Sequence, residues 1–191
     1  MNYALIFIGA AVVNNFILTY FLGICPFLGV STDLKKASGM GFAVIFVMLL
    51  ASAATWGIYH KILTPYNLQY LQNVAFILVI ATLVQFVEMF MKRFIPPLYK
   101  GLGIYLPLIT TNCAILGVTL FMVLKDFDFI ESLFYALGAG SGFLMALLIM
   151  AGIRVRLDSA DIPAPFRGAG IALITAGCLA LIFTGFSGMM K

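Results

Sequence analysis

The sequence predicts an all-α membrane protein with six transmembrane helices and little chain outside the bilayer. Of its 191 residues, 63% are hydrophobic and only 9% are charged, whereas soluble domains are about 45–50% apolar and about 25% charged. The apolar residues form six long runs separated by polar or proline-containing segments. A helix of roughly 20 apolar residues crosses the hydrocarbon core, so six of them use most of the chain. We therefore expect one integral membrane domain over residues 1–191.

Each apolar run ends at a polar, charged or proline-containing segment, where a helix is expected to stop. The six expected spans are residues 3–24, 39–59, 71–91, 102–124, 130–153 and 168–189. Helices are expected because backbone polar groups in lipid must be satisfied within their own segment. Strands of a membrane barrel are shorter and alternate in polarity, unlike these runs. The first run is too long for the apolar part of a signal peptide, and no Lys or Arg precedes it.

Basic residues are distributed unequally between the two sides of the expected bundle. The first, third and fifth loops hold Lys35, Lys36, Lys92, Arg93, Lys100, Arg154, Arg156 and Arg167, whereas the opposite side holds Lys61, Lys125 and Lys191. The positive-inside rule places the odd loops in the cytoplasm and both termini on the outer side of a bacterial or archaeal cytoplasmic membrane. This asymmetry accounts for the net charge of +4. Nucleic-acid binding would need a basic stripe on one face, and we expect no such partner.

The sequence contains a weak internal repeat. Residues 25–30 and 113–118 share the pattern Cys-x-x-Leu-Gly-Val, and each copy lies in the first span of a three-helix half. These halves cover about residues 1–95 and 96–191. Because three is an odd number, the second half must enter the membrane in the opposite direction, which makes an inverted repeat. Equivalent residues then lie around a pseudo-two-fold axis, so Cys25 and Cys113 are expected to approach each other near the middle of the bilayer.

Both copies of the repeat carry residues that disfavour a continuous helix in lipid. The first has Asn14-Asn15 upstream and Pro26 directly after the cysteine; the second has Pro107 and the run Thr110-Thr111-Asn112. Proline removes a backbone donor, and polar side chains within a span need partners inside the protein. We expect the first helix of each half to be interrupted and to line a buried site. The alternative is a kinked helix whose Thr and Asn side chains bond to neighbouring backbone.

The cysteines allow several kinds of chemistry. For Cys25 and Cys113 the sequence leaves open a disulfide, a metal site or simple packing. His60 is the single histidine and no Cys-x-x-Cys pair occurs, so a complete zinc site is excluded. An iron–sulfur cluster takes four thiolates; this pair would supply two of them, and a second subunit of similar architecture the rest. Cys178 lies in a small-residue stretch and is expected to be a packing residue.

Four segments resemble the RnfA/NqrE family of membrane subunits. They are residues 13–16 (Val-Asn-Asn-Phe), 21–27 (Phe-Leu-Gly-Ile-Cys-Pro-Phe), 105–114 (Tyr-Leu-Pro-Leu-Ile-Thr-Thr-Asn-Cys-Ala) and 162–168 (Ile-Pro-Ala-Pro-Phe-Arg-Gly). The resemblance covers essentially the whole chain. The cysteine segments are closer to the RnfA branch, from ion-translocating ferredoxin:NAD oxidoreductases, than to the NqrE branch, from sodium-pumping NADH:quinone oxidoreductases.

The resemblance implies a role in electron transfer within a larger complex. A 2Fe-2S cluster would be shared with an RnfE-like homologue of opposite orientation, each chain giving two cysteines, here Cys25 and Cys113. Thr110, Thr111 and Asn112 are candidates to surround that cluster. Other subunits would carry flavins and further iron–sulfur centres, and electron flow would be coupled to Na⁺ or H⁺ translocation. No independent activity of this chain, and no catalytic residue in it, is expected.

Glu88 is the one carboxylate well inside an apolar run. An intramembrane carboxylate is a functional candidate, so Glu88 is a candidate for ion coupling. The alternative is an i,i+4 ion pair with Lys92 near the helix end.

Two other functions fit the same pattern. Inverted repeats and broken helices are typical of secondary transporters, which would purify colourless and without iron. A purely structural subunit would retain electron transfer when Cys25 or Cys113 is replaced by serine.

Overall fold

The computed structural model describes residues 3–94, 106–157, 159–161, 163 and 166–187. This part of the chain contains α-helices and short π or 3₁₀ turns, with no strand. The elements, in order, are α1 (Tyr3–Ile8), η1 (Gly9–Val13), α2 (Phe16–Tyr20), α3 (Ile24–Val30), α4 (Leu34–Ile58), η2 (Tyr59–Leu63), η3 (Gln69–Leu71), α5 (Gln72–Phe94), α7 (Leu106–Thr110), α8 (Cys113–Leu124), α9 (Phe129–Leu157) and α10 (Ala169–Ser187). The expected all-helical fold is confirmed.

Four helical stretches are long and apolar enough to cross a membrane. They are Leu34–Leu63, Gln69–Phe90, Pro107–Leu124 and Phe129–Leu157. The apolar helices Tyr3–Val13 and Ala169–Gly185 are shorter. The first expected span is therefore not one continuous helix, because the chain breaks after η1 and again after α2. The structure confirms a multi-pass helical protein, with fewer full-length spans among the described residues than the six that hydropathy predicts.

Two expected boundaries differ from those observed. The segment after residue 24 is helical as α3, and α4 begins at Leu34 instead of residue 39. Asp33 explains the earlier start, because its carboxylate accepts a hydrogen bond from the backbone N–H of Lys35 at 3.0 Å and caps the helix. The second difference is at the end of α9, which continues to Leu157 instead of ending at residue 153. Its last turn contains Arg154 and Arg156, and positive charge is favourable at the C-terminal end of a helix.

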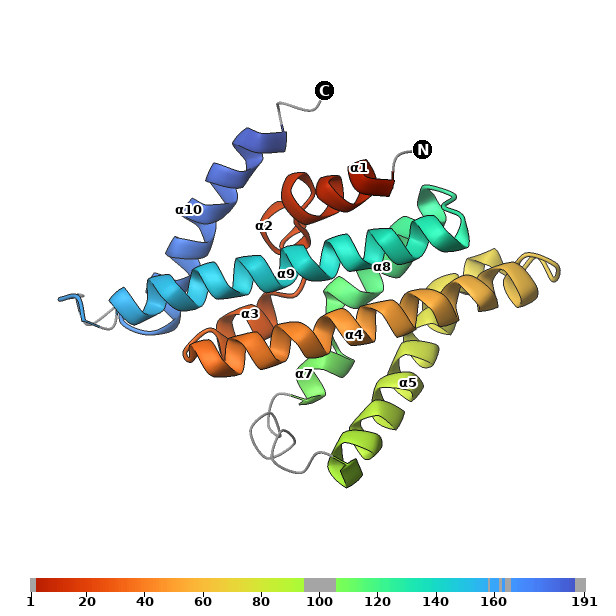
Figure 1. Ribbon diagram of the computed structural model, residues 1–191, viewed down its shortest axis with the longest axis horizontal. Coiled ribbons are helices and arrows are strands. Elements are labelled where there is room, and N and C mark those ends of the chain that lie inside the picture. The colour runs from red at the N-terminus through yellow and green to blue at the C-terminus, as the bar shows by residue number, and fades with distance from the viewer. Residues whose placement is uncertain (1–2, 95–105, 158, 162, 164–165, 188–191) are drawn as a thin grey trace.

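The centre of the molecule is the antiparallel pair of long helices α4 and α9 (Figure 1). Glycines allow the two helices to approach closely. A Cβ at Gly140 would lie 2.9 Å from Cγ1 of Ile45, and a Cβ at Gly41 would clash with Leu144. The two contacts are reciprocal, since each helix presents a glycine to a large side chain of the other. Small residues at such positions are typical of helix packing in membranes.

The N-terminal elements and α10 pack beside α9 (Figure 1). Asn15 is fully buried and links the N-terminal elements to α9: its Nδ2 donates a hydrogen bond to the carbonyl of Gly142 at 2.8 Å. Its Oδ1 accepts one from the backbone N–H of Ile17 at 3.1 Å, which caps α2. Phe16 then packs edge-on against Phe121 and Tyr135. The polar pair expected to break the first helix does so, and Asn15 satisfies the backbone that the break exposes.

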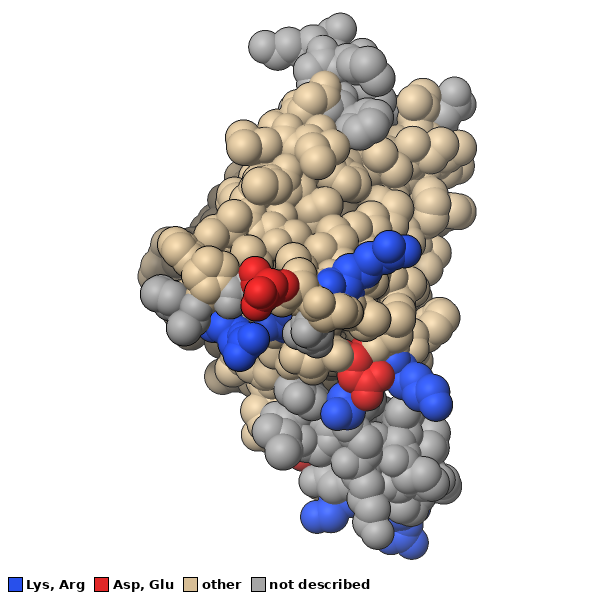
Figure 2. Space-filling model, turned by 90° about the vertical axis from the view of Figure 1, so that its left-hand side faces the viewer, with Lys and Arg blue, Asp and Glu red and all other residues tan. Residues whose placement is uncertain are grey.

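Basic side chains gather at one end of the molecule. Figure 2 shows Lys and Arg on the end where α4 begins and α9 finishes. Lys35 and Lys36 lie in the first turn of α4, and Arg154 and Arg156 in the last turn of α9. Since the helices are antiparallel, the loop before α4 and the loop after α9, which the sequence assigns to the same side, share one end of the bundle.

Candidate functional site

The two cysteines of the repeat both lie at the start of a helix. Cys25 is the second residue of α3, and Cys113 is the first residue of α8. The break before α3 lies at Phe21 and Gly23, both in left-handed conformations, and not at Pro26. Pro26 lies in the first turn of α3, where a missing N–H removes no helical hydrogen bond. Both thiols are exposed on the surface of this chain.

The structure brings the two cysteine segments into direct contact. The backbone N–H of Gly23 donates a hydrogen bond to Sγ of Cys113 at 3.0 Å. Gly23 has a φ of +83°, and a Cβ there would lie 2.9 Å from Cε2 of Phe143 and 3.1 Å from Oδ1 of Asn112. Glycine is therefore needed both for the backbone conformation and for the close approach. Gly23 and Cys113 are 90 positions apart in the sequence, yet their segments form one site.

Asn112 caps the N-terminus of α8 in the same way that Asn15 caps the N-terminus of α2. Its Oδ1 accepts a hydrogen bond from the backbone N–H of Ala114 at 3.0 Å. Asn112 is 4% exposed, and its buried Nδ2 has no hydrogen-bond partner among the described residues. A buried amide donor without a partner is costly, which makes this group available to an acceptor brought by another molecule.

Of the two threonines beside Asn112, the structure describes the side chain of Thr111 alone. Thr111 is exposed, and its hydroxyl donates to the carbonyl of Pro107 at 3.0 Å; it stabilises the end of α7 and is not directed to Cys113 by this bond. Thr110 ends α7, and its side chain lies outside the described part of the structure.

The site has the donor chemistry of half a metal centre. Two exposed thiols suit a thiophilic iron–sulfur cluster, and the Gly23 N–H supplies the kind of hydrogen bond to sulfur that tunes such clusters. The described residues contain no group of three or more His, Cys, Asp or Glu side chains that could hold a metal ion. The residues fit a shared cluster, because their thiols are exposed and a second chain would have to complete the ligand set.

Glu88 and Cys178 lie on helices at the edge of the bundle. Glu88 is half-buried on α5, and the described part of the chain places no metal-binding cluster around it. Cys178 is exposed on α10, which differs from the packing role expected for it. Ala172, Ala176 and Ala180 instead form the buried stripe of α10, because their spacing of four places them on one face that Cys178 does not share.

Sequence reasoning missed Gly23 and Arg154. Gly23 stands two residues before Cys25, and glycine beside a cysteine motif is a usable signal for a close backbone approach. Nη1 of Arg154 donates to the carbonyl of Leu28 at 2.7 Å and to Oγ of Ser31 at 2.9 Å. It thereby holds the end of α3 against α9. No local pattern predicts these bonds, because the residues they join are 126 and 123 positions apart.

The fold defines a polytopic membrane protein in which two exposed cysteines lie on adjoining segments. Comparison with known proteins identifies the class more narrowly. A family described as "Rnf-Nqr subunit, membrane protein" matches residues 3–190, and the chain belongs to this family.

Individual relatives are similar in sequence to this chain over nearly the full length of both proteins. The chain is 56% identical to the A subunit of the ion-translocating oxidoreductase complex of Syntrophotalea carbinolica, over 99% of this chain and 98% of the relative. It is 54% identical, with the same coverage, to the A subunit of the Na⁺-translocating ferredoxin:NAD⁺ oxidoreductase complex of Acetobacterium woodii. The A subunit of the ion-translocating oxidoreductase complex of Aeromonas hydrophila is 52% identical to this chain, over 100% of this chain and 98% of the relative. The resemblance to the RnfA branch that the motifs indicate is confirmed.

Proposed function

We propose that this chain is a membrane electron-transfer subunit of an ion-translocating ferredoxin:NAD oxidoreductase. The names of its relatives support this complex. The observation that carries the electron-transfer role is the hydrogen bond from Gly23 to Sγ of Cys113, because it brings both cysteine segments to one exposed site. A packing role for these cysteines would not require exposed thiols.

In this proposal Cys25 and Cys113 hold two of the four ligand positions of a 2Fe-2S cluster. The cluster, when bound, supplies one-electron transfer. The chain's own residues bind and tune it: the two sulfurs are ligands, the Gly23 N–H withdraws charge from the Cys113 sulfur, and the Asn112 amide is a second available donor. Hydrogen bonds to sulfur stabilise the reduced, more negative state and raise the reduction potential.

The remaining two ligands would come from a homologous subunit of opposite orientation. The motif Cys-x-x-Leu-Gly-Val, which recurs at residues 25–30 and 113–118, is the basis for an inverted repeat within this chain. Such a repeat places equivalent residues around an axis in the membrane plane. A partner built on the same plan would present its own cysteine pair at the same depth.

Electron movement through the membrane gives a physical basis for ion transport. Moving one charge across the field is worth about 2.3 kcal/mol per 100 mV, so an electron step can drive the counter-movement of Na⁺ or H⁺. Glu88 is the carboxylate of this chain that we assign to coupling, because it is half-buried on a membrane-length helix.

The test is iron content and electron paramagnetic resonance of the purified complex, comparing wild type with Cys25→Ser and Cys113→Ser. Cys178→Ser is the matched control, because Cys178 is also exposed but lies on α10. Each ligand variant should lose one 2Fe-2S signal and ferredoxin-to-NAD electron transfer while the complex still assembles, and the control should retain both. Survival of signal and activity in both ligand variants would refute the proposal.

A further inference from the structure

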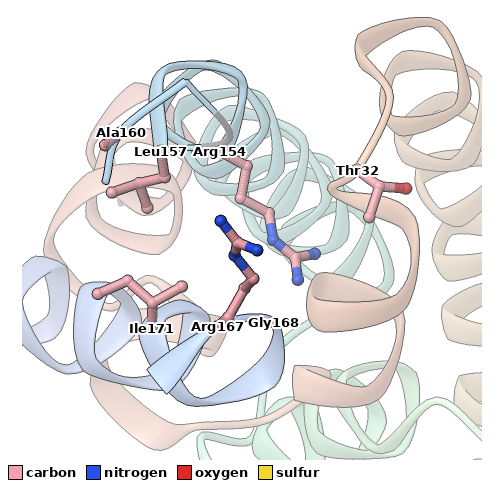
Figure 3. A pocket seen from close by; sticks show the side chains of 7 residues that line it. All are labelled: Thr32, Arg154, Leu157, Ala160, Arg167, Gly168 and Ile171. Carbon is pink, nitrogen blue, oxygen red and sulfur yellow. The ribbon is translucent and has the colours of Figure 1, made fainter. Parts of the chain in front are cut away.

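A cavity of about 330 Å³, with no cysteine in its lining, lies at the basic end of the molecule. It is bounded by the end of α9, the start of α10 and the turn before α4 (Figure 3). The residues that line it are Thr32, Arg154, Leu157, Ala160, Arg167, Gly168 and Ile171. Two guanidinium groups therefore share one cavity with an apolar wall.

Arg154 is held in place before any ligand binds. The carbonyl of Leu28 and the hydroxyl of the fully buried Ser31 both accept hydrogen bonds from its Nη1. A guanidinium has five N–H donors in a fixed fork, so its other nitrogens remain available to a ligand. Because the side chain is already ordered, a ligand does not have to bear the entropy of fixing it.

Arg167 points into the same cavity from just before α10 (Figure 3). Among the described residues, no carboxylate forms an ion pair with either guanidinium. Two like charges beside a partly apolar cavity repel each other, and an anion between them relieves that repulsion. The N-terminus of α10, a helix of 19 residues, adds backbone donors at Gly168 and beyond.

We propose that this cavity binds the headgroup phosphate of an anionic phospholipid. Arginine forks and a helix N-terminus match phosphate oxygens, while Leu157, Ala160 and Ile171 offer an apolar wall to the acyl part of the lipid. Free phosphate would use the first feature and not the second. Basic pockets between membrane helices are suited to such headgroups. The site is independent of the electron-transfer proposal, because none of its lining residues is a cysteine.

The test uses the intact complex in detergent with a photoactivatable phosphatidylglycerol, and measures adducts on this chain by mass spectrometry. Arg167→Gln should lower labelling of the peptides around Leu157 and Ile171 by about tenfold, the loss expected for one charge-assisted hydrogen-bonding group. Arg156→Gln is the matched control, since Arg156 is an exposed arginine of the same last turn of α9 that does not line the cavity.

Competition in the wild-type complex tests the site without any variant. Unlabelled phosphatidylglycerol should displace the probe, whereas phosphatidylcholine and millimolar inorganic phosphate should not. Equal displacement by phosphatidylcholine, or equal loss of labelling in Arg156→Gln, would overturn the proposal by showing apolar or diffuse electrostatic binding. Displacement by inorganic phosphate alone would overturn the lipid assignment in favour of a soluble anion.

Discussion

The backbone N–H of Gly23 and the sulfur of Cys113 lie 3.0 Å apart in a hydrogen bond, which joins the two interrupted helices of the chain. The bond connects the residue before α3 with the first residue of α8. Its geometry requires the left-handed conformation of Gly23 and leaves no space for a side chain there. Anything that moves Gly23 therefore moves both cysteine segments relative to each other.

Gly23→Ala should destabilise the protein by about 1–3 kcal/mol, because alanine is strained at positive φ and its Cβ would meet Phe143 and Asn112. The measurement is the apparent melting temperature of the purified complex. Gly57→Ala is the matched control, since nothing lies within 4 Å of a Cβ at that helical position, and it should be neutral or slightly stabilising. Equal stability of the two variants would contradict the strained role of Gly23.

Asn15→Ala should lower the stability of the protein by roughly 2 kcal/mol or more, because the variant loses the cap of α2 and leaves the buried carbonyl of Gly142 without its donor. Limited proteolysis in detergent should show earlier cleavage within the N-terminal elements. Asn14→Ala, at a half-buried neighbour, should lower the stability less. A larger loss of stability in Asn14→Ala would contradict the anchoring role of Asn15.

Asn112→Asp tests the donor that we assign to the cluster. Aspartate keeps an oxygen for the Ala114 N–H and removes the Nδ2 donor while adding negative charge. The reduction potential of the 2Fe-2S signal should fall, because the reduced cluster loses stabilisation. A redox titration followed by electron paramagnetic resonance measures it. Thr111→Val, which removes a hydroxyl bonded to Pro107, should leave the potential unchanged, and an unshifted potential in Asn112→Asp would exclude Asn112 as a tuning residue.

Glu88→Gln should uncouple ion transport from electron transfer if Glu88 carries the coupling proton or Na⁺. In proteoliposomes, ferredoxin-dependent NAD reduction should persist while ion uptake falls several-fold. Glu131→Gln is the control, because Glu131 lies in the first turn of α9, where its carboxylate accepts a hydrogen bond from the backbone N–H of Asp128 at 3.4 Å. Unchanged ion uptake in Glu88→Gln would favour the alternative of a structural helix-end carboxylate.

Reporter fusions test the orientation that the basic residues predict. With both termini on the outer side, alkaline phosphatase fused after Lys191 should be active, and a fluorescent protein fused there should be dark. The shared location of the first turn of α4 and the last turn of α9 predicts a cytoplasmic position for both. Fluorescence of the C-terminal fusion would show that the C-terminus is cytoplasmic and that the predicted orientation is wrong.

Much of the fold follows from local properties of the chain. Apolar runs of membrane length predict helices because lipid leaves the backbone no other partner, and α5, α9 and α10 lie close to the predicted ranges. The polar positions Asn15 and Asn112 mark the breaks correctly. The sequence did not predict the break at Gly23, because Pro26 is the more obvious helix breaker. In the structure Pro26 lies in the first turn of α3 and does not disrupt it.

The sequence by itself determined the membrane class and the helix breaks at Asn15 and Asn112, because hydropathy and helix-breaking residues are properties of neighbouring residues. The tertiary structure decided that Gly23 contacts Cys113, that Arg154 anchors α3, and that Arg154 and Arg167 face one cavity. These relationships join residues far apart in the chain, and only the packing of the helices around α4 and α9 brings them together.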